Sequence, residues 1–482
     1  MQEKNSTELK RSLNLIDATM IVAGSMIGSG IFIVSADMSR TVGSSGYLLL
    51  LWLLTGAITV VAALSYGELA GMMPKAGGQY VYIQRAYNPF IAFLYGWTVF
   101  MVIQTGVIAA VAVAFAKFSA VFIPSLNNEL LSIGSFKITY AKFYAIASIV
   151  LLTFLNSKGI KNGKIVQLIF TSTKLLALLA LILLGIFIGL KGDVLHNNFQ
   201  NMWDATSRTI TDGKIIDIPL AGWALLGAMG ATIINSLFSS DAWNNVTFIA
   251  GEIKDPQKNI PRSLFLGTFI VTIIYILANV AYLALLPLKG DPTTGDVLGQ
   301  GIQYATNDRV GTAAASMIFG DTAVYIMAIL IMISTFGCNN GLILSGARLY
   351  YAMAHDGLFF KKAATLNNKQ VPAYALTLQC IWASILCLSG KYGDLLEYAT
   401  FASLLFYVVT IAGVFILRKK EPDTERPYKA FGYPLLPALY IIITTAICID
   451  LLIYKTSSTG MGLLIVIIGI PVYFLNRNKL PK

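Results

Sequence analysis

Residues 24–30 read GSMIGSG and interrupt the first apolar segment of the chain, and residues 238–243 read FSSDAW and interrupt the sixth. Each glycine inside a helix costs about 1 kcal/mol relative to alanine, so the glycines of the first stretch predict a break. Backbone N–H and C=O groups that a break frees near the bilayer midplane can bind a substrate or an ion. Matching breaks in two halves of a chain therefore indicate the binding site of a secondary transporter.

The composition is that of a polytopic membrane protein. Of the 482 residues, 56% are hydrophobic and only 12% are charged, and the mean hydropathy is +0.69. A net charge of +11 would suit a nucleic-acid partner, but the lysines and arginines lie in short loops between apolar runs. Membrane topology explains that placement, so we expect a lipid bilayer and no nucleic acid.

Runs of about 20 apolar residues predict twelve membrane-spanning helices and an all-α fold. They lie near 13–36, 45–73, 88–118, 139–158, 163–190, 220–250, 262–288, 321–351, 372–390, 393–417, 434–454 and 460–476. The first five helices and the next five form comparable halves, and because five is odd the second half is inverted in the membrane. Lys and Arg are about twice as numerous in the N-terminus and the loops on its side of the membrane as in the loops on the opposite side. This asymmetry predicts cytoplasmic termini.

This frame divides the chain into five parts. We expect an inverted-repeat transport core at 13–417 and two further helices within 434–476. Cytoplasmic segments at 1–12, 418–433 and 477–482 complete the chain.

Cysteine and histidine usage gives no sign of a metal site, a disulfide framework or a cofactor. The four cysteines, Cys338, Cys380, Cys387 and Cys448, all fall inside apolar runs, and the two histidines lie in or beside loops. The sequence also lacks the HExxH and GxSxG motifs of hydrolytic enzymes. These observations predict that the protein is not an enzyme. A channel or a receptor would not need broken helices in inverted register.

The two breaks supply groups that suit a zwitterion. Gly28-Ser29-Gly30 places a hydroxyl between two residues without a Cβ, which allows unwinding and exposes N–H groups to an anion. The alternative is a small-residue packing face, because Gly24 and Gly28 have GxxxG spacing. The sixth segment offers Ser239, Ser240 and Asp241, and a carboxylate at membrane depth indicates function by default.

Lys174 is the second ionisable group at membrane depth, about eleven residues into the fifth predicted span. A buried ammonium needs carbonyl groups or an anion around it, or it loses its proton. A structural clamp, a fixed cation in place of a bound sodium ion, and a proton-coupling group remain open as its role.

These segments resemble the amino acid/polyamine/organocation (APC) superfamily, and within it the L-type amino acid transporter family. The resemblance lies in GSMIGSGIF (24–32), SYGELAGMMPKAGGQYVYI (65–83), FTSTKLLAL (170–178), FSSDAWNNVTFIAGEIKDPQKNIP (238–261) and GARLYYAMAHDG (346–357). The matches cover most of the first eight predicted spans. The resemblance implies a LeuT-like fold and transport by alternating access.

The resemblance also implies roles for individual residues. Ser29 and Gly30 match positions that receive the substrate carboxylate, and Phe238 matches an aromatic gate over the substrate. The carbonyls of Met26 and Ile27 face the substrate ammonium, opposite those of Phe238, Ser239 and Asp241. Lys174 matches the lysine that replaces a sodium ion and is the expected coupling residue. The expected binding residues are thus Met26, Ile27, Gly28, Ser29, Gly30, Phe238, Ser239 and Asp241.

The sequence departs from the family pattern in two places. Ala242 stands where relatives often have glycine, so the unwound segment is expected to be less free. Residues 119–138, the predicted outside loop after the third span, contain no cysteine, so no disulfide-linked heavy chain is expected. A bacterial inner-membrane protein is the simpler interpretation.

We therefore predict a sodium-independent exchanger or permease for L-amino acids, with neutral ones as the first choice. The alternative is a cationic amino acid or polyamine carrier, because Asp241 offers a partner for a substrate cation. Proton coupling is part of that alternative.

Overall fold

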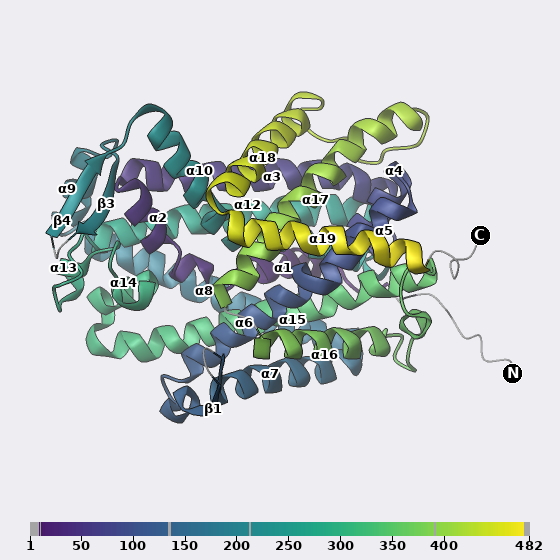
Figure 1. Ribbon diagram of the computed structural model, residues 1–482, viewed down its shortest axis with the longest axis horizontal. Helices are drawn as coiled ribbons and strands as arrows, with labels where there is room; N and C mark the ends of the chain where they lie inside the picture. The colour runs from purple at the N-terminus through teal and green to yellow at the C-terminus, as the bar shows by residue number, and fades with distance from the viewer. Residues whose placement is uncertain (1–8, 10, 134–135, 212–213, 390–391, 477–482) are drawn as a thin grey trace, which may run out of the picture.

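The computed structural model describes residues 9, 11–133, 136–211, 214–389 and 392–476 as a helical bundle (Figure 1). Nine of the described helical segments are long and apolar enough to cross a membrane. Three shorter apolar helices accompany them, at Leu15–Met26, Ala373–Leu388 and Thr459–Leu475. Together these segments match all twelve predicted spans.

The first half of the chain contains both short and long helices. They are α1 (Leu15–Met26), η1 (Gly30–Phe32), α2 (Ser35–Val42), α3 (Ser45–Met72), α4 (Gln79–Ala86), α5 (Pro89–Thr98), the π-helical turn η2 (Val99–Ile103), α6 (Gln104–Ser119), η3 (Pro124–Asn127), α7 (Tyr140–Ser157) and α8 (Ile160–Gly189). The first predicted span is therefore α1, η1 and α2 in series, and the third is α5, η2 and α6.

The second half of the chain also contains both short and long helices. Its elements are α9 (Val194–Gln200), α10 (Gly222–Ser239), α11 (Asn245–Phe248), η4 (Ala250–Glu252), α12 (Pro256–Leu285), α13 (Val297–Gln300), η5 (Thr306–Asp308), α14 (Val310–Phe319), η6 (Gly320–Thr322), α15 (Ala323–His355), η7 (Lys361–Ala364), α16 (Ala373–Ser389), α17 (Tyr392–Lys420), α18 (Leu435–Tyr454) and α19 (Thr456–Asn476). The sixth predicted span is α10 followed, after a break, by α11 and η4.

Corresponding helices of the two halves pack against each other. α3 contacts α12, α6 contacts α15, and α7 contacts α16, which pairs spans two with seven, three with eight and four with nine. The broken spans also meet, because η1 contacts α10 and α11 contacts α1. Pairing of each span with its counterpart five spans later is what an inverted repeat predicts.

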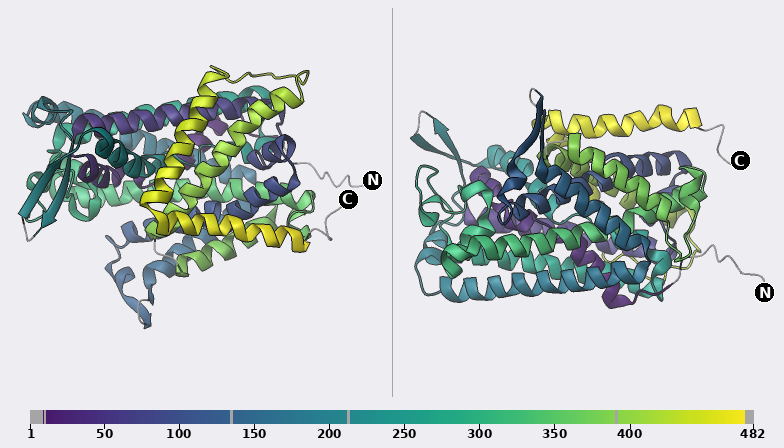
Figure 2. Two further views of the ribbon diagram at one scale, coloured as in Figure 1. Left: turned by 45° about the horizontal axis from the view of Figure 1, so that its top comes forward. Right: turned by 90° about the horizontal axis from the view of Figure 1, so that it is seen from below.

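Two antiparallel hairpins were not predicted from the sequence. β1 (Glu129–Ile133) pairs with β2 (Phe136–Thr139), and β3 (Thr206–Thr211) pairs with β4 (Lys214–Pro219). The β3–β4 hairpin projects from one end of the bundle (Figure 2). There the Arg208 guanidinium donates to both carboxylate oxygens of Asp217, at 2.5 and 2.6 Å, and holds the pKa of that carboxyl below its usual range. The membrane-spanning part remains all helical.

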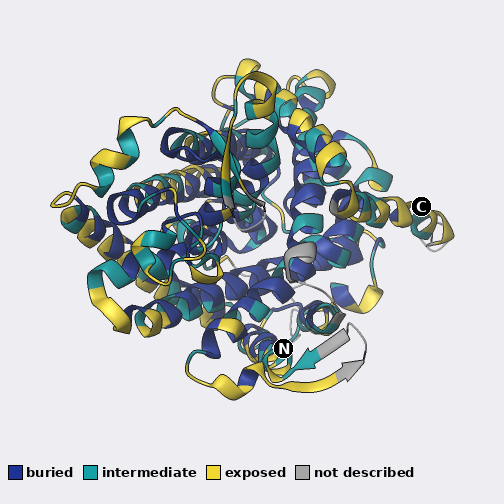
Figure 3. Ribbon diagram, turned by 60° about the vertical axis from the view of Figure 1, so that its left-hand side comes forward, coloured by how far each residue is buried: buried dark blue, intermediate teal, exposed yellow. Residues whose placement is uncertain are grey.

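Exposed residues lie on the outside of the bundle and buried ones inside it (Figure 3), and many of the exposed residues are large and apolar. Leucine, isoleucine and phenylalanine side chains on α8 and α18 are largely exposed, such as Leu183 (61%), Phe187 (62%) and Ile442 (66%). A water-soluble protein would bury such side chains, but lipid is as apolar as they are. α18 and α19 lie at the edge of the bundle (Figure 2).

Ion pairs join the helices at the opposite end from the β3–β4 hairpin. Glu68 accepts from Arg418 at 2.9 and 2.7 Å and from the Ala430 N–H at 2.7 Å. Arg348 of α15 donates to Glu252 of η4 at 3.1 Å, and both side chains are almost completely buried. The first contacts join α3 to α17 and to the segment that follows it, and the second joins η4 to α15.

Candidate functional site

The first break lies where the sequence placed it. α1 ends at Met26, Ile27 is extended (φ −78°, ψ 96°), and helical geometry resumes in η1 at Gly30. In the described chain, the N–H groups of Gly28 and Gly30 donate no hydrogen bond to a main-chain carbonyl. Free N–H groups at the start of a helical turn suit a carboxylate.

The second break follows α10. Ser240 caps that helix, and Ala242 has φ of 64°, the left-handed conformation that L-residues other than glycine rarely adopt. The sequence predicted a stiffer segment at Ala242, and the chain unwinds there in spite of the alanine. Strain of this kind is held by the surrounding structure and clusters at functional sites.

The two breaks touch at Gly30 and Ser239. A Cβ atom added at Gly30 would lie 2.2 Å from Ser239 Oγ and 2.9 Å from Ser239 Cβ. A Cβ added at Gly28 would meet only Cys338 Sγ, at 3.7 Å. Gly30 is therefore required for the close approach of the breaks. Gly24 has the packing role that the GxxxG alternative described, because its Cβ would meet Gln167 and Thr171 of α8.

Lys174 of α8 lies behind the first break. Its ammonium donates to the carbonyls of Gly24 and Ile27, both at 2.6 Å, and lies 3.4 Å from the Ser334 carbonyl. The side chain is 2% exposed, and in the part of the chain that the structure describes no carboxylate pairs with it. A cation surrounded by carbonyl oxygens has the environment of a bound metal ion.

Most of the carbonyls expected to face a substrate ammonium accept hydrogen bonds from the protein in this structure. Tyr275 of α12 places its hydroxyl 3.2 Å from the Met26 carbonyl and 3.0 Å from that of Ser239. The Ile27 carbonyl binds Lys174 and, at 3.0 Å, Ser334 Oγ. The Tyr275 hydroxyl has one proton and a carbonyl has two lone pairs, so the Met26 and Ser239 carbonyls keep acceptor capacity, whereas the Ile27 carbonyl already has two donors. The roles of Met26 and Ile27 in binding stay predictions.

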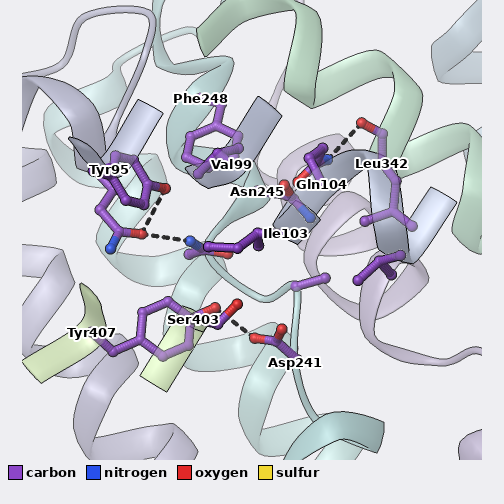
Figure 4. Close-up of a pocket in the computed structure, with 14 residues that line it drawn as sticks. Tyr95, Val99, Ile103, Gln104, Asp241, Asn245, Phe248, Leu342, Ser403 and Tyr407 are labelled. Atoms are coloured by element: carbon purple, nitrogen blue, oxygen red, sulfur yellow. Dashed lines mark hydrogen bonds between the residues drawn. The ribbon is translucent and has the colours of Figure 1, made fainter. Parts of the chain in front are cut away.

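The Asp241 side chain lies in a polar cavity beside the second break (Figure 4). Tyr407 of α17 donates to its Oδ1 at 2.5 Å. The cavity is small, about 20 Å³, and Asn245 Oδ1 lies in its buried lining without a hydrogen-bond partner. Gln104 of α6 also lines the cavity and donates to the Leu342 carbonyl of α15 at 2.7 Å, so it both joins two helices and faces the cavity.

Phe238 lines a different, larger cavity. This cavity has a volume of about 230 Å³, lies towards the β3–β4 end, and includes Gly30, Asp37 and Arg40. Phe238 and Gly30 thus lie on its wall, and Asp241 lies in the two smaller cavities deeper in the bundle. This arrangement fits a gate at Phe238, a role that stays a prediction.

The sequence did not single out Tyr275, Ser334 or Tyr407 as site residues. Each is an ordinary polar residue within an apolar helix, and the neighbouring sequence does not mark it as functional. The π-helical turn η2, which ends just before Gln104, is a local irregularity of the kind found at functional sites.

These features define a class: a multi-pass membrane protein with two broken helices that meet at its centre is a secondary transporter. The comparisons with known proteins agree. Residues 13–473 match the model of the amino acid permease family, so the chain belongs to that family. It is a transporter and not an enzyme, and the resemblance to the APC superfamily is confirmed.

Three relatives illustrate the match. Human large neutral amino acids transporter small subunit 2 is 30% identical, with 97% of this chain and 80% of the relative covered. The serine/threonine exchanger SteT of Bacillus subtilis is 31% identical, with 97% of both covered. Mouse b(0,+)-type amino acid transporter 1 is 28% identical, with 98% and 89% covered.

Proposed function

We propose that this protein is a sodium-independent exchanger or permease that carries L-amino acids, neutral ones first, by alternating access. The observation that carries the proposal is the Lys174 ammonium, 2.6 Å from the carbonyls of Gly24 and Ile27. It supplies a positive charge where an unwound helix would otherwise need a cation. The relatives named for neutral amino acids and for serine and threonine support neutral substrates.

The substrate would lie at the contact of the two breaks. The N–H groups of Gly28 and Gly30, with Ser29, receive the carboxylate, and carbonyls of the broken helices receive the ammonium. Within the core at 13–417, a bundle built from the broken helices rocks against the rest, and α18 and α19 lie outside the core. We propose cytoplasmic termini in a bacterial inner membrane and no disulfide-linked partner. In support, the four cysteines lie within helices, away from the loops.

Replacing sodium by choline should leave uptake unchanged. The reason is that Lys174 occupies the carbonyl site permanently, so no sodium ion is needed to complete it. The measurement is uptake of radiolabelled serine, alanine and leucine into proteoliposomes, with and without the same amino acid inside. Strict dependence on sodium would contradict the proposal, and uptake that requires internal substrate would identify exchange.

A cationic substrate is the second candidate, because of the Asp241 cavity. Asp241 and Asn245 present acceptor oxygens to a space that holds about one water-sized group, and a substrate ammonium would donate to them. The similarity to b(0,+)-type amino acid transporter 1, at 28% identity, is a further reason to test cationic substrates directly.

Asp241→Asn separates the two candidates. If the substrate is neutral, affinity for alanine, serine or leucine should change by less than about tenfold, or roughly 1.4 kcal/mol. Tyr407→Phe is the matched control, since it removes the 2.5 Å hydrogen bond and keeps the carboxylate. Competition by twenty amino acids and by putrescine is the measurement. Selective loss of arginine and lysine transport in Asp241→Asn alone would reverse the ranking.

A further inference from the structure

An aromatic groove lies on the membrane-facing side of the bundle, apart from the transport site. It is formed by α5, the end of α15 with η7, and α19, and its volume is about 410 Å³. Phe93, Trp97 and Phe100 line one wall, and Phe359 and Tyr473 line the others. The volume is within the range of sites that bind small molecules.

The groove lies within one leaflet. The lining residues of α5 and the following turn η2 end at Phe100, about 16 Å along this helical segment from Pro89 at a rise of about 1.5 Å per residue, which is about half the thickness of a bilayer core. Around it the surface is apolar, with Phe360, Phe474 and Leu475 at 59%, 54% and 79% exposure. Such a surface is in contact with lipid, so a lipid is the molecule that reaches it.

The walls of the groove are held in place before any ligand binds. Trp97 donates its indole N–H to the Ile465 carbonyl at 3.0 Å, which fixes α5 to α19. Phe100 packs edge-on against Phe359 with ring centroids 5.2 Å apart, and Phe93 lies 5.3 Å from Tyr473. Aromatic contacts of this kind stabilise the walls beyond the effect of burial alone, and they restrict the rings.

Positive charge lies at one mouth of the groove. Lys361 lines it, Lys362 follows on η7, and both side chains are exposed. The nearby carboxylate, Asp356, is bound elsewhere, because it accepts from Tyr80 at 2.8 Å and from Gln84 at 3.0 Å. Basic groups beside an apolar groove at the membrane surface suit an anionic headgroup.

We propose that this groove is a binding site for an anionic glycerophospholipid, with its acyl chains between the aromatic walls and its phosphate on Lys361 and Lys362.

The test measures lipid binding to the full-length protein in detergent. Phosphatidylglycerol and phosphatidylcholine with identical acyl chains are added, and bound lipid is counted by native mass spectrometry. We expect the anionic lipid to bind preferentially, and Lys361→Ala and Lys362→Ala to weaken it by about fivefold each. Val472→Trp, which fills the groove, should remove both lipids. Glycerophosphoglycerol, which has the headgroup without acyl chains, should not bind.

Lys369→Ala is the matched control, since this exposed lysine lies in the same loop but beside Gly159 at the α7–α8 junction. Binding should be unchanged in this variant. An equal loss in all three lysine variants would mean surface attraction without a site and would overturn the proposal. Equal binding of the two lipids by the unaltered protein, or full binding by Val472→Trp, would overturn it as well.

Discussion

Gly30→Val should severely weaken substrate binding while the protein still folds. The new side chain would begin 2.2 Å from Ser239 Oγ and 3.2 Å from the Ser239 Cα, so the broken helices must separate. Overpacking of this kind costs about 1–3 kcal/mol of free energy, and here the strain displaces the groups that bind the substrate. We expect affinity to fall by about thirtyfold or more. Binding of radiolabelled serine or leucine to purified protein measures it, with helical content checked by circular dichroism.

Gly28→Ala is the control, because its Cβ would meet only Cys338 Sγ, at the ordinary contact distance of 3.7 Å. This variant keeps the Gly28 N–H and should bind nearly as well as the unaltered protein. If the two variants lose affinity equally, general loss of glycine flexibility explains the effect. Full affinity in Gly30→Val would show that the contact with Ser239 does not shape the site.

Lys174→Ala should slow transport by at least about tenfold and change substrate binding much less. Removing the ammonium takes one donor from the buried carbonyls of Gly24 and Ile27, and in the described chain only Ile27 keeps another donor, Ser334 Oγ. Leaving a buried carbonyl unsatisfied costs about 1–3 kcal/mol. Lys174 lies behind the unwound segment, so losing its hydrogen bonds weakens the packing of α8 against α1 and not the substrate pocket. The transport cycle must change this packing. Uptake into proteoliposomes and equilibrium binding, measured on the same preparation, separate the two effects.

Lys161→Ala removes a lysine from the same helix at an exposed position and should transport normally. Adding sodium to Lys174→Ala is a second arm, since a sodium ion that restores transport would show that the ammonium replaces it. If Lys174 exchanges a proton, uptake by the unaltered protein rises as the external pH falls, and the variant loses that dependence. A permanent charge instead predicts a variant that is uniformly slow at every pH. Wild-type rates in Lys174→Ala would show a tolerated cation without a role in coupling.

Much of the fold was predictable because it depends on local composition. All twelve predicted spans correspond to described apolar helices, since about 20 apolar residues are needed to cross a bilayer wherever they occur. The breaks at 27–29 and 240–244 were equally local, because Gly and Ser weaken a helix at their own position. The two hairpins were missed, because their strands are only four to six residues long and lie outside the long apolar runs.

The candidate site was predictable in its broken segments and at Lys174. Lys174 was found because a charge at membrane depth stands out in any sequence. Tyr275, Ser334 and Tyr407 were not found, because hydroxyl-bearing residues are common in membrane helices and most of them join helices.

The sequence by itself determined where the helices cross, where two of them break, and which charges lie at depth. The tertiary structure decided what those groups contact. Lys174 reaches a carbonyl 150 positions away at Gly24, and Tyr407 reaches Asp241 across 166 positions. Hydrophobicity and helix propensity act over one or a few turns, whereas these contacts depend on how α1, α8, α10 and α17 cross. That crossing is set by the packing of the whole bundle, so no short stretch of sequence contains it.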